Sequence, residues 1–549
     1  MARPLQMDPA LKKIATERQI VYLNAVNEFG GLSPAARHLG VQPSTIGRSM
    51  QRLTNRATKG IGLTGGKAPP SQRLVRRWLL TAAQDETPVE PAFWANLHAY
   101  AADIGAEVLV GGFTYQKGLF EDHATRSAVF AEAVRPFLRH DNEMLGPLLF
   151  AAKMNILPTA TRPLSGLETY SRGAWAVFPH AKTQMVSVPA LPGGRPAQVF
   201  TTGACTVPNY IEKKAGLKAE FHHTIGAVIV EVDEHARIFC RQIGASSDGS
   251  FQDLDALVRG GAVTRGHRIE ALTPGDLHIE KADPEVFLSM FGYDVAEQRI
   301  ITTDSLIHAL RPRHTAWHDI LDFEARNHHR RGDHHFLFKM IANGTDKVED
   351  GTRAVARFLR ATAFEWMTSV VVASNHNDAL QRWLREADPR ADAMNARYWC
   401  ELNAELYRQI EAQGGGGTDP QAPEAKFDIF QWAVSRHDPQ ALSDIVFVPR
   451  NGSYLVCQAQ GGIEIGMHGD EGPNGARGSA LALSRVATRM NIGHAHTPTI
   501  LDGVYTAGLC GLLDQGYNSG PSGWSHTMTL TYPSSKRTLL TLWDGKWRA

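Results

Sequence analysis

The stretch "IGHAHTP" (residues 492–498) places two histidines, His494 and His496, on alternate positions just before a proline. At the end of a β-strand this spacing points both imidazoles to the same side of the strand. Two such side chains either converge on a metal ion or lie side by side on one face of a sheet. The stretch alone favours the second interpretation, because pairs of this kind are common by chance. The rest of the chain therefore decides between them.

Four further segments place metal-type ligands directly after strand-like runs of residues. In chain order they are "RIEALTPGDLHIEK" (268–281) with Asp276 and His278, "HTAWHDILDF" (314–323) with Asp319, "SVVVASNHND" (369–378) with Asn375 and His376, and "GIEIGMHGDEG" (462–472) with His468. In a layered α/β fold, side chains at the carboxyl ends of strands meet at one rim. Oxygen and nitrogen ligands without a thiolate suit Mn, Fe, Zn or Mg, and a carboxylate that can bridge suits a pair of metals about 3.5–4 Å apart.

The order D-x-H, D, N-H, H, G-H-x-H over residues 266–549 resembles that of the calcineurin-like metallophosphoesterases. The resemblance implies a four-layer β-sandwich flanked by helices. It also implies two divalent metal ions, with Mn as the first choice and Fe, Zn or Mg as alternatives, that activate water for in-line attack on phosphorus. By position, one metal is expected at Asp276, His278 and His496 and the other at Asn375, His468 and His494, with Asp319 bridging them and His376 protonating the leaving oxygen.

The chain departs from this family pattern at three places. His318 stands where the family has a glycine before the bridging aspartate, and Ser374 stands where it has a glycine before the asparagine ligand. Asn377 replaces the acidic residue that often follows the catalytic histidine, and Asp378 comes one position later. Every ligand type of the family is nevertheless present, so we expect an active metal centre.

Residues 19–56, "QIVYLNAVNEFGGLSPAARHLGVQPSTIGRSMQRLTNR", have helical periodicity throughout. A first helix is expected to end at Gly30-Gly31, Ser33 to cap a short second helix closed by Gly40, and a third helix to begin at Pro43 or Ser44. The stretch resembles the N-terminal helix-turn-helix reader of LysR-type regulators, and a plain three-helix bundle is the alternative. The third helix is expected to bury Ile46, Met50 and Leu53 and to offer Gln42, Ser44, Thr45, Arg48 and Arg52 to DNA.

The composition is that of an ordinary soluble globular chain of 549 residues, and the length predicts about three or four domains. The fold class we expect is α/β, as an α+β multi-domain chain. We divide it into a helix-turn-helix domain (1–65), a middle α/β domain of unknown role (66–265) and the phosphoesterase domain (266–549). A Gly- and Pro-rich insertion at about 411–426 is expected to interrupt the last of these.

Charge and cysteine content restrict the setting in which the chain works. With 57 Lys and Arg against 56 Asp and Glu, any nucleic-acid-binding surface must be a local patch. Five dispersed cysteines without a CxxC pair fit a reducing cytosol. We find no signal peptide and no membrane span, so we expect a cytoplasmic protein, in a bacterial host if it is phage-encoded. By analogy with other helix-turn-helix proteins we expect a homo-oligomer.

Two further segments favour DNA as the substrate. "RNHHRRGDHHFLFK" (326–339) could line a phosphate track with Arg330 and Arg331, although a solvated helix face explains it equally well. The closing stretch 493–542 resembles phage-encoded proteins related to DNA-repair exonucleases. Its polar and aromatic residues either shape a substrate groove or fill the core, and they are Tyr505, Tyr517, Asn518, Trp524, Ser525 and His526.

The sequence therefore predicts a metal-dependent phosphodiesterase that acts on DNA, a nuclease. Two alternatives remain open. One is a nucleotide or cyclic-nucleotide phosphodiesterase whose small N-terminal domain only senses or assembles. The other is a DNA-binding regulator with a degenerate phosphoesterase body.

Overall fold

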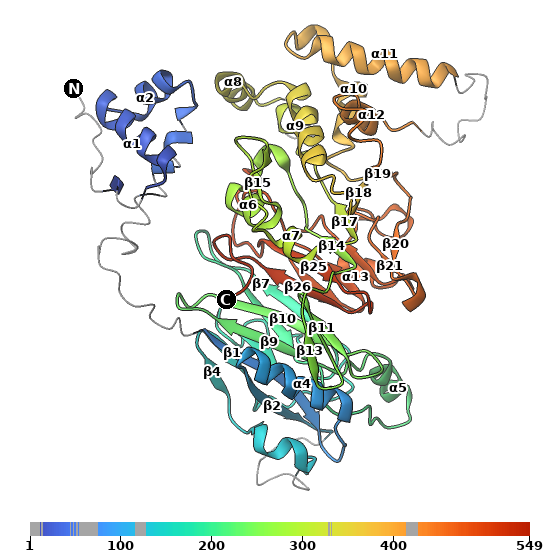
Figure 1. The fold of residues 1–549 in the computed structure, drawn as a ribbon. Helices are drawn as coiled ribbons and strands as arrows, with labels where there is room; N and C mark the ends of the chain where they lie inside the picture. Colours follow the sequence, from blue (N-terminus) through green and yellow to red (C-terminus); the bar gives the residue numbers. More distant parts are fainter. Residues whose placement is uncertain are drawn as a thin grey trace. The chain divides into compact units, whose positions relative to one another are not determined.

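The computed structural model describes residues 11–12, 15–43, 45–47, 49–50, 53, 75–115, 128–327, 330, 332–412 and 427–549 (Figure 1). Its contacts divide the chain into two units. The first comprises the described residues up to 73 together with 339–344, and the second comprises the remaining described residues. The mixed α/β class expected from the sequence is confirmed by several sheets and many helices.

The first unit is helical. Helix α1 (Glu17–Phe29) begins with a capping box between Thr16 and Gln19 and ends at Gly30, whose φ is 69°. The N-cap of α2 (Leu32–Leu39) is Gly31 and not Ser33, because the Ala35 N–H already bonds to the Gly31 carbonyl. The described residues among 43–53 are also helical. As predicted, Ile46, Met50 and Leu53 are buried, and they pack with Leu23 and Val26 of α1.

The second unit contains a six-stranded sheet in which four neighbouring strands run parallel. The three inner parallel strands are rich in β-branched and apolar residues and are buried on both faces, as is usual for parallel sheets. In spatial order the strands are β19 (Val446–Val448), β18 (Thr368–Val372), β17 (His314–Trp317), β14 (Ala271–Thr273), β25 (Thr527–Thr531) and β26 (Arg537–Thr541).

A ten-stranded sheet combines distant parts of the chain. Strand β7 from the middle segment pairs with β23 near the C-terminus, so strands on both sides of residue 265 share one sheet and lie in the same unit. In spatial order the strands are β20 (Leu455–Val456), β21 (Ile463–Glu464), β22 (Met490–Ile492), β24 (Val504–Thr506), β23 (Thr499–Leu501), β7 (Met185–Val188), β8 (Ala197–Thr201), β6 (Trp175–Phe178), β5 (Leu148–Phe150) and β4 (Glu143–Leu145). The four-layer arrangement within 266–549 alone stays a prediction.

The third large sheet has five strands, and two small sheets accompany it. The five-stranded sheet consists of β10 (Ile238–Gly244), β9 (Gly226–Val232), β1 (Arg76–Gln84), β2 (Glu107–Phe113) and β3 (Leu138–Arg139). The small sheets are β11 (Phe251–Asp253) with β12 (Ala256–Arg259) and β13 (Ala262–Thr264), and β15 (Tyr293–Asp294) with β16 (Arg299–Ile300).

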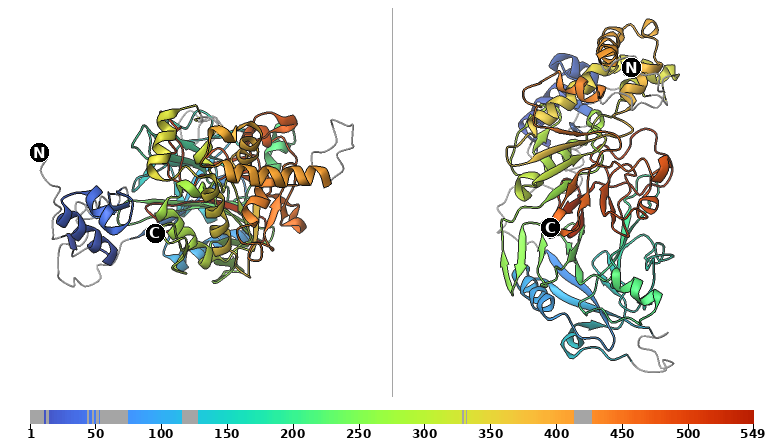
Figure 2. Two further views of the ribbon diagram at one scale, coloured as in Figure 1. Left: turned by 90° about the horizontal axis from the view of Figure 1, so that it is seen from above. Right: turned by 90° about the vertical axis from the view of Figure 1, so that its right-hand side faces the viewer.

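Helices cover the outer sides of these sheets (Figures 1 and 2). Buried residues of α6, α9, α10 and α12 pack on the six-stranded sheet around Trp317 and Val371, and α4 packs on the five-stranded sheet. The helices of this unit are α4 (Pro91–Ile104), α5 (Lys214–Phe221), α6 (Pro284–Phe291), α7 (Leu306–Leu310), α8 (His334–Asn343, partly in the first unit), α9 (Val348–Ala361), α10 (Ala379–Glu386), α11 (Ala396–Ala412), α12 (Ile429–Ser435) and α13 (Ala480–Leu483).

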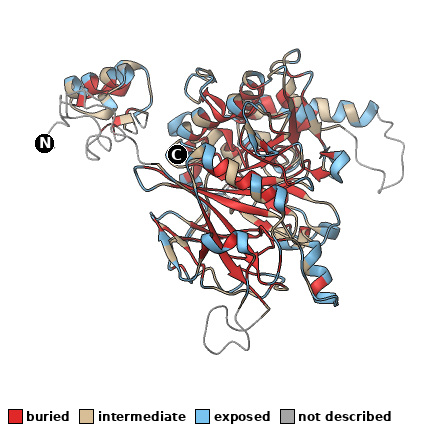
Figure 3. Cartoon of the chain, turned by 60° about the horizontal axis from the view of Figure 1, so that its bottom comes forward, coloured by how far each residue is buried: buried red, intermediate tan, exposed pale blue. Residues whose placement is uncertain are grey.

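The ten-stranded sheet also packs directly against its neighbours. Ala316 and Val372 of the six-stranded sheet contact Val456 and Ile463 of the ten-stranded sheet in a buried cluster. Most residues of the strands in these two sheets are accordingly buried (Figure 3). This packing fixes the carboxyl ends of strands from both sheets, which carry the candidate site. Among the described helices, none has the length and apolar character needed to cross a membrane.

Candidate metal centre

The seven side chains that the sequence predicts as metal ligands come together in the structure. They follow parallel strands: β14, β17 and β18 in the six-stranded sheet, and β21 and β22 in the ten-stranded sheet. The loops after these strands carry Asp276 and His278 (β14), Asp319 (β17), Asn375 (β18), His468 (β21), and His494 and His496 (β22). Strand ends that meet at one rim therefore bring residues 220 positions apart into contact.

Asp276, His278 and His496 form a first group. His496 Nε2 lies 2.8 Å from Asp276 Oδ2 and 3.2 Å from His278 Nε2. His278 Nδ1 lies 2.8 Å from Asp322 Oδ1, and such a carboxylate orients a metal-binding imidazole and leaves its other nitrogen free to coordinate. One ligand atom from each member of the group lies within 4.8 Å of the others. This donor set fits a divalent cation.

His468, Asp319, Asn375 and His494 form a second group. His468 Nε2 lies 3.1 Å from Asp319 Oδ2, and His494 Nδ1 lies 3.2 Å from Asn375 Oδ1. The ring centroids of the two histidines are 5.3 Å apart. Asp276 connects the groups, because its Oδ1 lies 3.8 Å from His468 Nδ1. Whether Asp319 bridges two metals stays a prediction.

The carboxylates and imidazoles of the site shift one another's pKa values. Burial disfavours the ionised form of Asp276, but His468 and His496 outweigh burial and hold the pKa of this carboxyl well below its usual range. Asp319 behaves in the same way, because His468 and His376 lower its pKa despite burial. Burial alone would lower the pKa of His468, but Asp319 and Asp276 raise it to about 9. Ionised, buried carboxylates of this kind attract a cation.

Four of the ligand residues have left-handed backbone conformations. The φ angles are 45° for His278, 39° for Asp319, 67° for His494 and 53° for His496. A side chain in this region costs about 1–3 kcal/mol and persists only where its surroundings impose it, typically at functional sites. The concentration of strain in these four residues supports a functional role for the cluster.

Gly493 makes the close approach of the two loops possible. A Cβ atom at this position would lie 2.1 Å from Asp276 Oδ1. We expect Gly493→Ala to displace this carboxylate and to weaken Mn²⁺ binding about 10- to 100-fold, as measured by titration calorimetry. Gly332→Ala is the matched control, because a Cβ there meets nothing within 4 Å. Equal Mn²⁺ affinities for the two variants would show that the packing at Gly493 does not position a ligand.

His376 lies beside the second group and is oriented by Asp322. Its Nδ1 lies 2.9 Å from the Asp322 carbonyl and 3.6 Å from Asp322 Oδ1, and its N–H bonds to Asp319 Oδ1. Burial would lower the pKa of His376, but Asp319 and Asp322 raise it above its ordinary value. Asp378 does not support His376 and instead pairs with Arg450 at 2.5 Å. Asp322 therefore occupies the role that the departure at Asn377 leaves open.

Three residues of the site are absent from the sequence-based prediction. His318 is buried with its Nδ1 3.3 Å from His468 Nδ1, and Asp276, His318 and His468 form a further group that could hold a metal. Asp322 joins His278 and His376, and Lys281 lies 2.9 Å from its Oδ2. The Nε2 atom of His318 has no hydrogen-bond partner among the described residues. The one feature of the sequence that could have indicated a role for His318 is that it replaces a glycine of the family pattern.

A cavity of about 990 Å³ opens over the cluster. Arg330, one of the predicted DNA contacts, lines it and donates a hydrogen bond to the Gly516 carbonyl. The other residues that line it include Asp319, Asn375, His376, His494, His496, Arg477, Tyr517 and Trp524. Metal-type ligands thus lie at the wall of a space large enough for a small organic ligand, with cationic side chains beside them.

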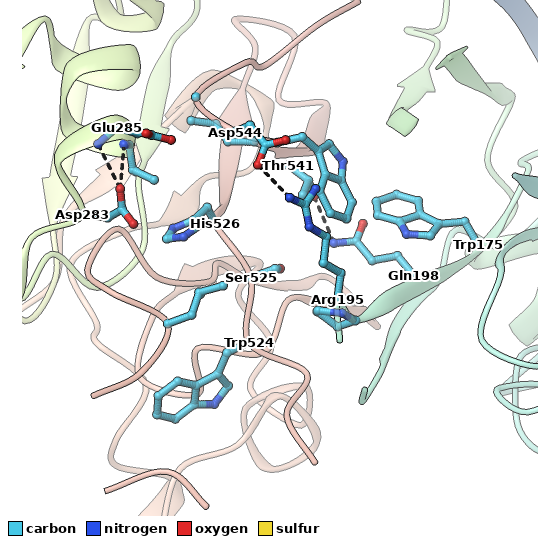
Figure 4. A pocket seen from close by; sticks show the side chains of 16 residues that line it. Trp175, Arg195, Gln198, Asp283, Glu285, Trp524, Ser525, His526, Thr541 and Asp544 are labelled. Atoms are coloured by element: carbon cyan, nitrogen blue, oxygen red, sulfur yellow. Dashed lines mark hydrogen bonds and ion pairs between the residues drawn. The ribbon is translucent and has the colours of Figure 1, made fainter. Parts of the chain in front are cut away.

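Trp524 also lines a second cavity, of about 170 Å³ (Figure 4). Arg195 lines it and pairs with Asp544 at 2.7 Å, and Gln198 donates to Thr541. The predicted tail residues Ser525 and His526 line this cavity, whereas Tyr505 is part of a buried core cluster. None of the described metal-type groups lines it.

The other predicted DNA contacts are only partly described. Gln42 is exposed and Thr45 is half-buried. The predictions for Ser44, Arg48, Arg52 and Arg331 lie outside the described residues. DNA contact by any of them stays a prediction.

Comparison with known proteins places the chain beside a phage protein. It is 36% identical over 491 residues to "Protein A1" of Escherichia phage T5, an alignment that covers 86% of this chain and 83% of the relative. No protein-family model matches the chain, and no solved structure matches it. The resemblance to metallophosphoesterases therefore stays an expectation.

Proposed function

The chain belongs to the family of protein A1 of Escherichia phage T5, and we propose that it is a metal-dependent phosphodiesterase that acts on DNA. The observation that carries the proposal is the convergence of two ligand groups that share Asp276, beside a histidine with a raised pKa. Divalent ions bound there would lower the pKa of water and neutralise charge on phosphoryl oxygens.

The chain's own residues supply the remaining steps. Asp276, His278 and His496 would hold one ion, and Asp319, Asn375, His468 and His494 a second. Ionised Asp322 favours the protonated form of His376, which lines the cavity and would give its proton to the departing oxygen of the DNA strand. Arg330 and Arg477, which line the same cavity, would hold the neighbouring phosphates.

The proton-donor role of His376 can be tested by the choice of leaving group. We expect His376→Gln to slow cleavage of DNA about 10²- to 10⁴-fold, because the departing alkoxide needs a proton. The same variant should hydrolyse bis-p-nitrophenyl phosphate nearly as fast as wild type, because nitrophenolate leaves without a proton. Steady-state rates with Mn²⁺ measure both reactions.

A matched variant and the competing outcomes complete this test. His235→Gln changes an exposed histidine away from the cavity and should leave both rates unchanged. Equal losses on the two substrates would contradict the role of His376 as proton donor. Turnover of nucleotides or cyclic nucleotides without cleavage of DNA would move the substrate to small molecules, and no turnover of either would overturn the proposed activity.

A further inference from the structure

Two aromatic side chains line the cavity next to the first ligand group. The ring of Trp524 lies 4.4 Å from the ring of His496 at an interplanar angle of 80°. The ring of Tyr517 lies 5.8 Å from that of Trp524, and both side chains line the cavity that also contains His376. Tyr517 is 48% exposed. An aromatic surface is therefore exposed to the cavity directly beside the candidate metal ligands, where a phosphate would bind.

The loop that carries Tyr517 is held in place by several hydrogen bonds. The Gln515 N–H donates to Asn518 Oδ1 at 2.9 Å, and Asn518 Nδ2 donates to the Leu513 carbonyl at 3.0 Å. Lys281 Nζ lies 5.8 Å from the centre of the Tyr517 ring. A ring on a loop that is held by hydrogen bonds loses little conformational entropy when a ligand stacks on it, and this favours binding.

Trp524 borders two cavities. It lines the large cavity over the ligand groups and also the cavity of about 170 Å³, at the border of which it is seen in Figure 4. Its backbone N–H is fixed by Ser522 Oγ at 3.2 Å. Trp524 is half-buried and borders both cavities, unlike the fully packed Trp317 of β17.

The size of the large cavity restricts what can reach the ligand groups. About 990 Å³ is at the upper end of the range for pockets that hold single small molecules. A few unpaired nucleotides fit this space. His496 lines this cavity and is almost completely buried, so a phosphate must enter the cavity to approach it.

From these observations, and resting on the proposed phosphodiesterase function, we propose that Trp524 and Tyr517 form a stacking platform for an unpaired nucleobase next to the scissile phosphate. The substrate is then a single strand or a frayed duplex end. Stacking of a base on an aromatic ring tolerates every base, because each has a π-face. The platform therefore distinguishes single-stranded from double-stranded DNA, and it does not distinguish one base sequence from another.

Binding and cleavage of three oligonucleotides test the platform. The probes are a fluorescent single strand, the same strand with abasic sites, and the same sequence as a duplex with covalently closed ends. We expect Trp524→Leu to weaken binding of the base-bearing strand roughly 5- to 150-fold in fluorescence anisotropy. Trp524→Phe should recover most of the affinity, and binding of the abasic strand should be unchanged in both variants.

A matched control separates local from general effects. Tyr407→Leu changes a tyrosine of α11 that is 60% exposed and does not line the cavity, and it should leave all affinities unchanged. Tyr517→Leu should weaken binding of the base-bearing strand in the same sense as Trp524→Leu. Preferred cleavage of the single strand over the closed duplex by the wild type would support the proposal.

Several outcomes would overturn the platform. Equal losses of Trp524→Leu on the abasic and base-bearing strands would show that Trp524 only positions His496. Equal cleavage of the closed duplex and the single strand would contradict entry of an unpaired strand. Binding is measured in EDTA, so the absence of any cleavage would overturn the proposed hydrolysis while the binding data still test stacking.

Discussion

Replacement of Asp276 by asparagine is expected to reduce metal-dependent DNA hydrolysis on the order of 1,000-fold. Both carboxylate oxygens of Asp276 lie within 3.1 Å of the His494 N–H, and the side chain contacts His496 and His468. The amide keeps the shape of the side chain but removes the negative charge that both ligand groups share. Weaker Mn²⁺ binding, measured by titration calorimetry, should accompany the loss of rate.

The matched control is Asp304→Asn, which removes the same charge from an exposed loop. It should retain wild-type hydrolysis and Mn²⁺ affinity. If Asp276→Asn stayed folded and cleaved DNA at the wild-type rate, the shared carboxylate would have no part in the reaction. Circular dichroism of both variants checks that the fold is kept.

The second large effect is expected on stability, at a buried ion-pair network that is separate from the ligand groups. Arg241 in β10 pairs with Asp253 at 2.7 Å and with Glu231 at 2.7 Å, and all three side chains are buried. Tyr100 donates a further hydrogen bond to Asp253. Arg241→Leu leaves the buried carboxylate of Asp253 without its cation and leaves Glu231 with Arg77 alone. We expect the free energy of unfolding to fall by about 3–5 kcal/mol.

Urea denaturation of the purified variants measures this loss. Arg390→Leu is the comparison, because the Arg390 side chain is 89% exposed and its pair with Asp388 is a surface pair that contributes little. A difference of less than about 1 kcal/mol between the two variants would mean that the buried network does not stabilise the fold.

The candidate site could be predicted in large part because it depends on a local rule. Asp276, Asp319 and Asn375 each follow a short apolar run, and parallel pairing of β14, β17 and β18 brings the ends of these runs together. The rule needs only the order of strands and ligands along the chain. The rule does not identify residues in the turns beyond the strand ends. Asp322 is an example, because nothing in its spacing indicates that it joins His278 to His376.

The arrangement of the middle segment could not be predicted for a different reason. Strand β7 pairs with β23, and this contact joins residues more than 300 positions apart. The sequence of a short apolar strand does not identify its partner strand, because pairing over such distances is decided by burial of both faces. The wrong N-cap prediction for α2 has a local cause. Ser33 has the side chain of a typical N-cap, but the extended residue Gly31 already starts the helix.

Incubation of the purified protein with linear DNA and Mn²⁺, followed by chelation with EDTA, tests the central claim most directly. Single-stranded and duplex forms are compared, with Asp276→Asn as the inactive reference. We expect fragments to accumulate with Mn²⁺, to stop accumulating when EDTA is added, and to be absent with the variant. DNA that stays intact with Mn, Fe, Zn and Mg in turn, while the protein is folded, would contradict the assignment of this cluster as a phosphodiesterase centre.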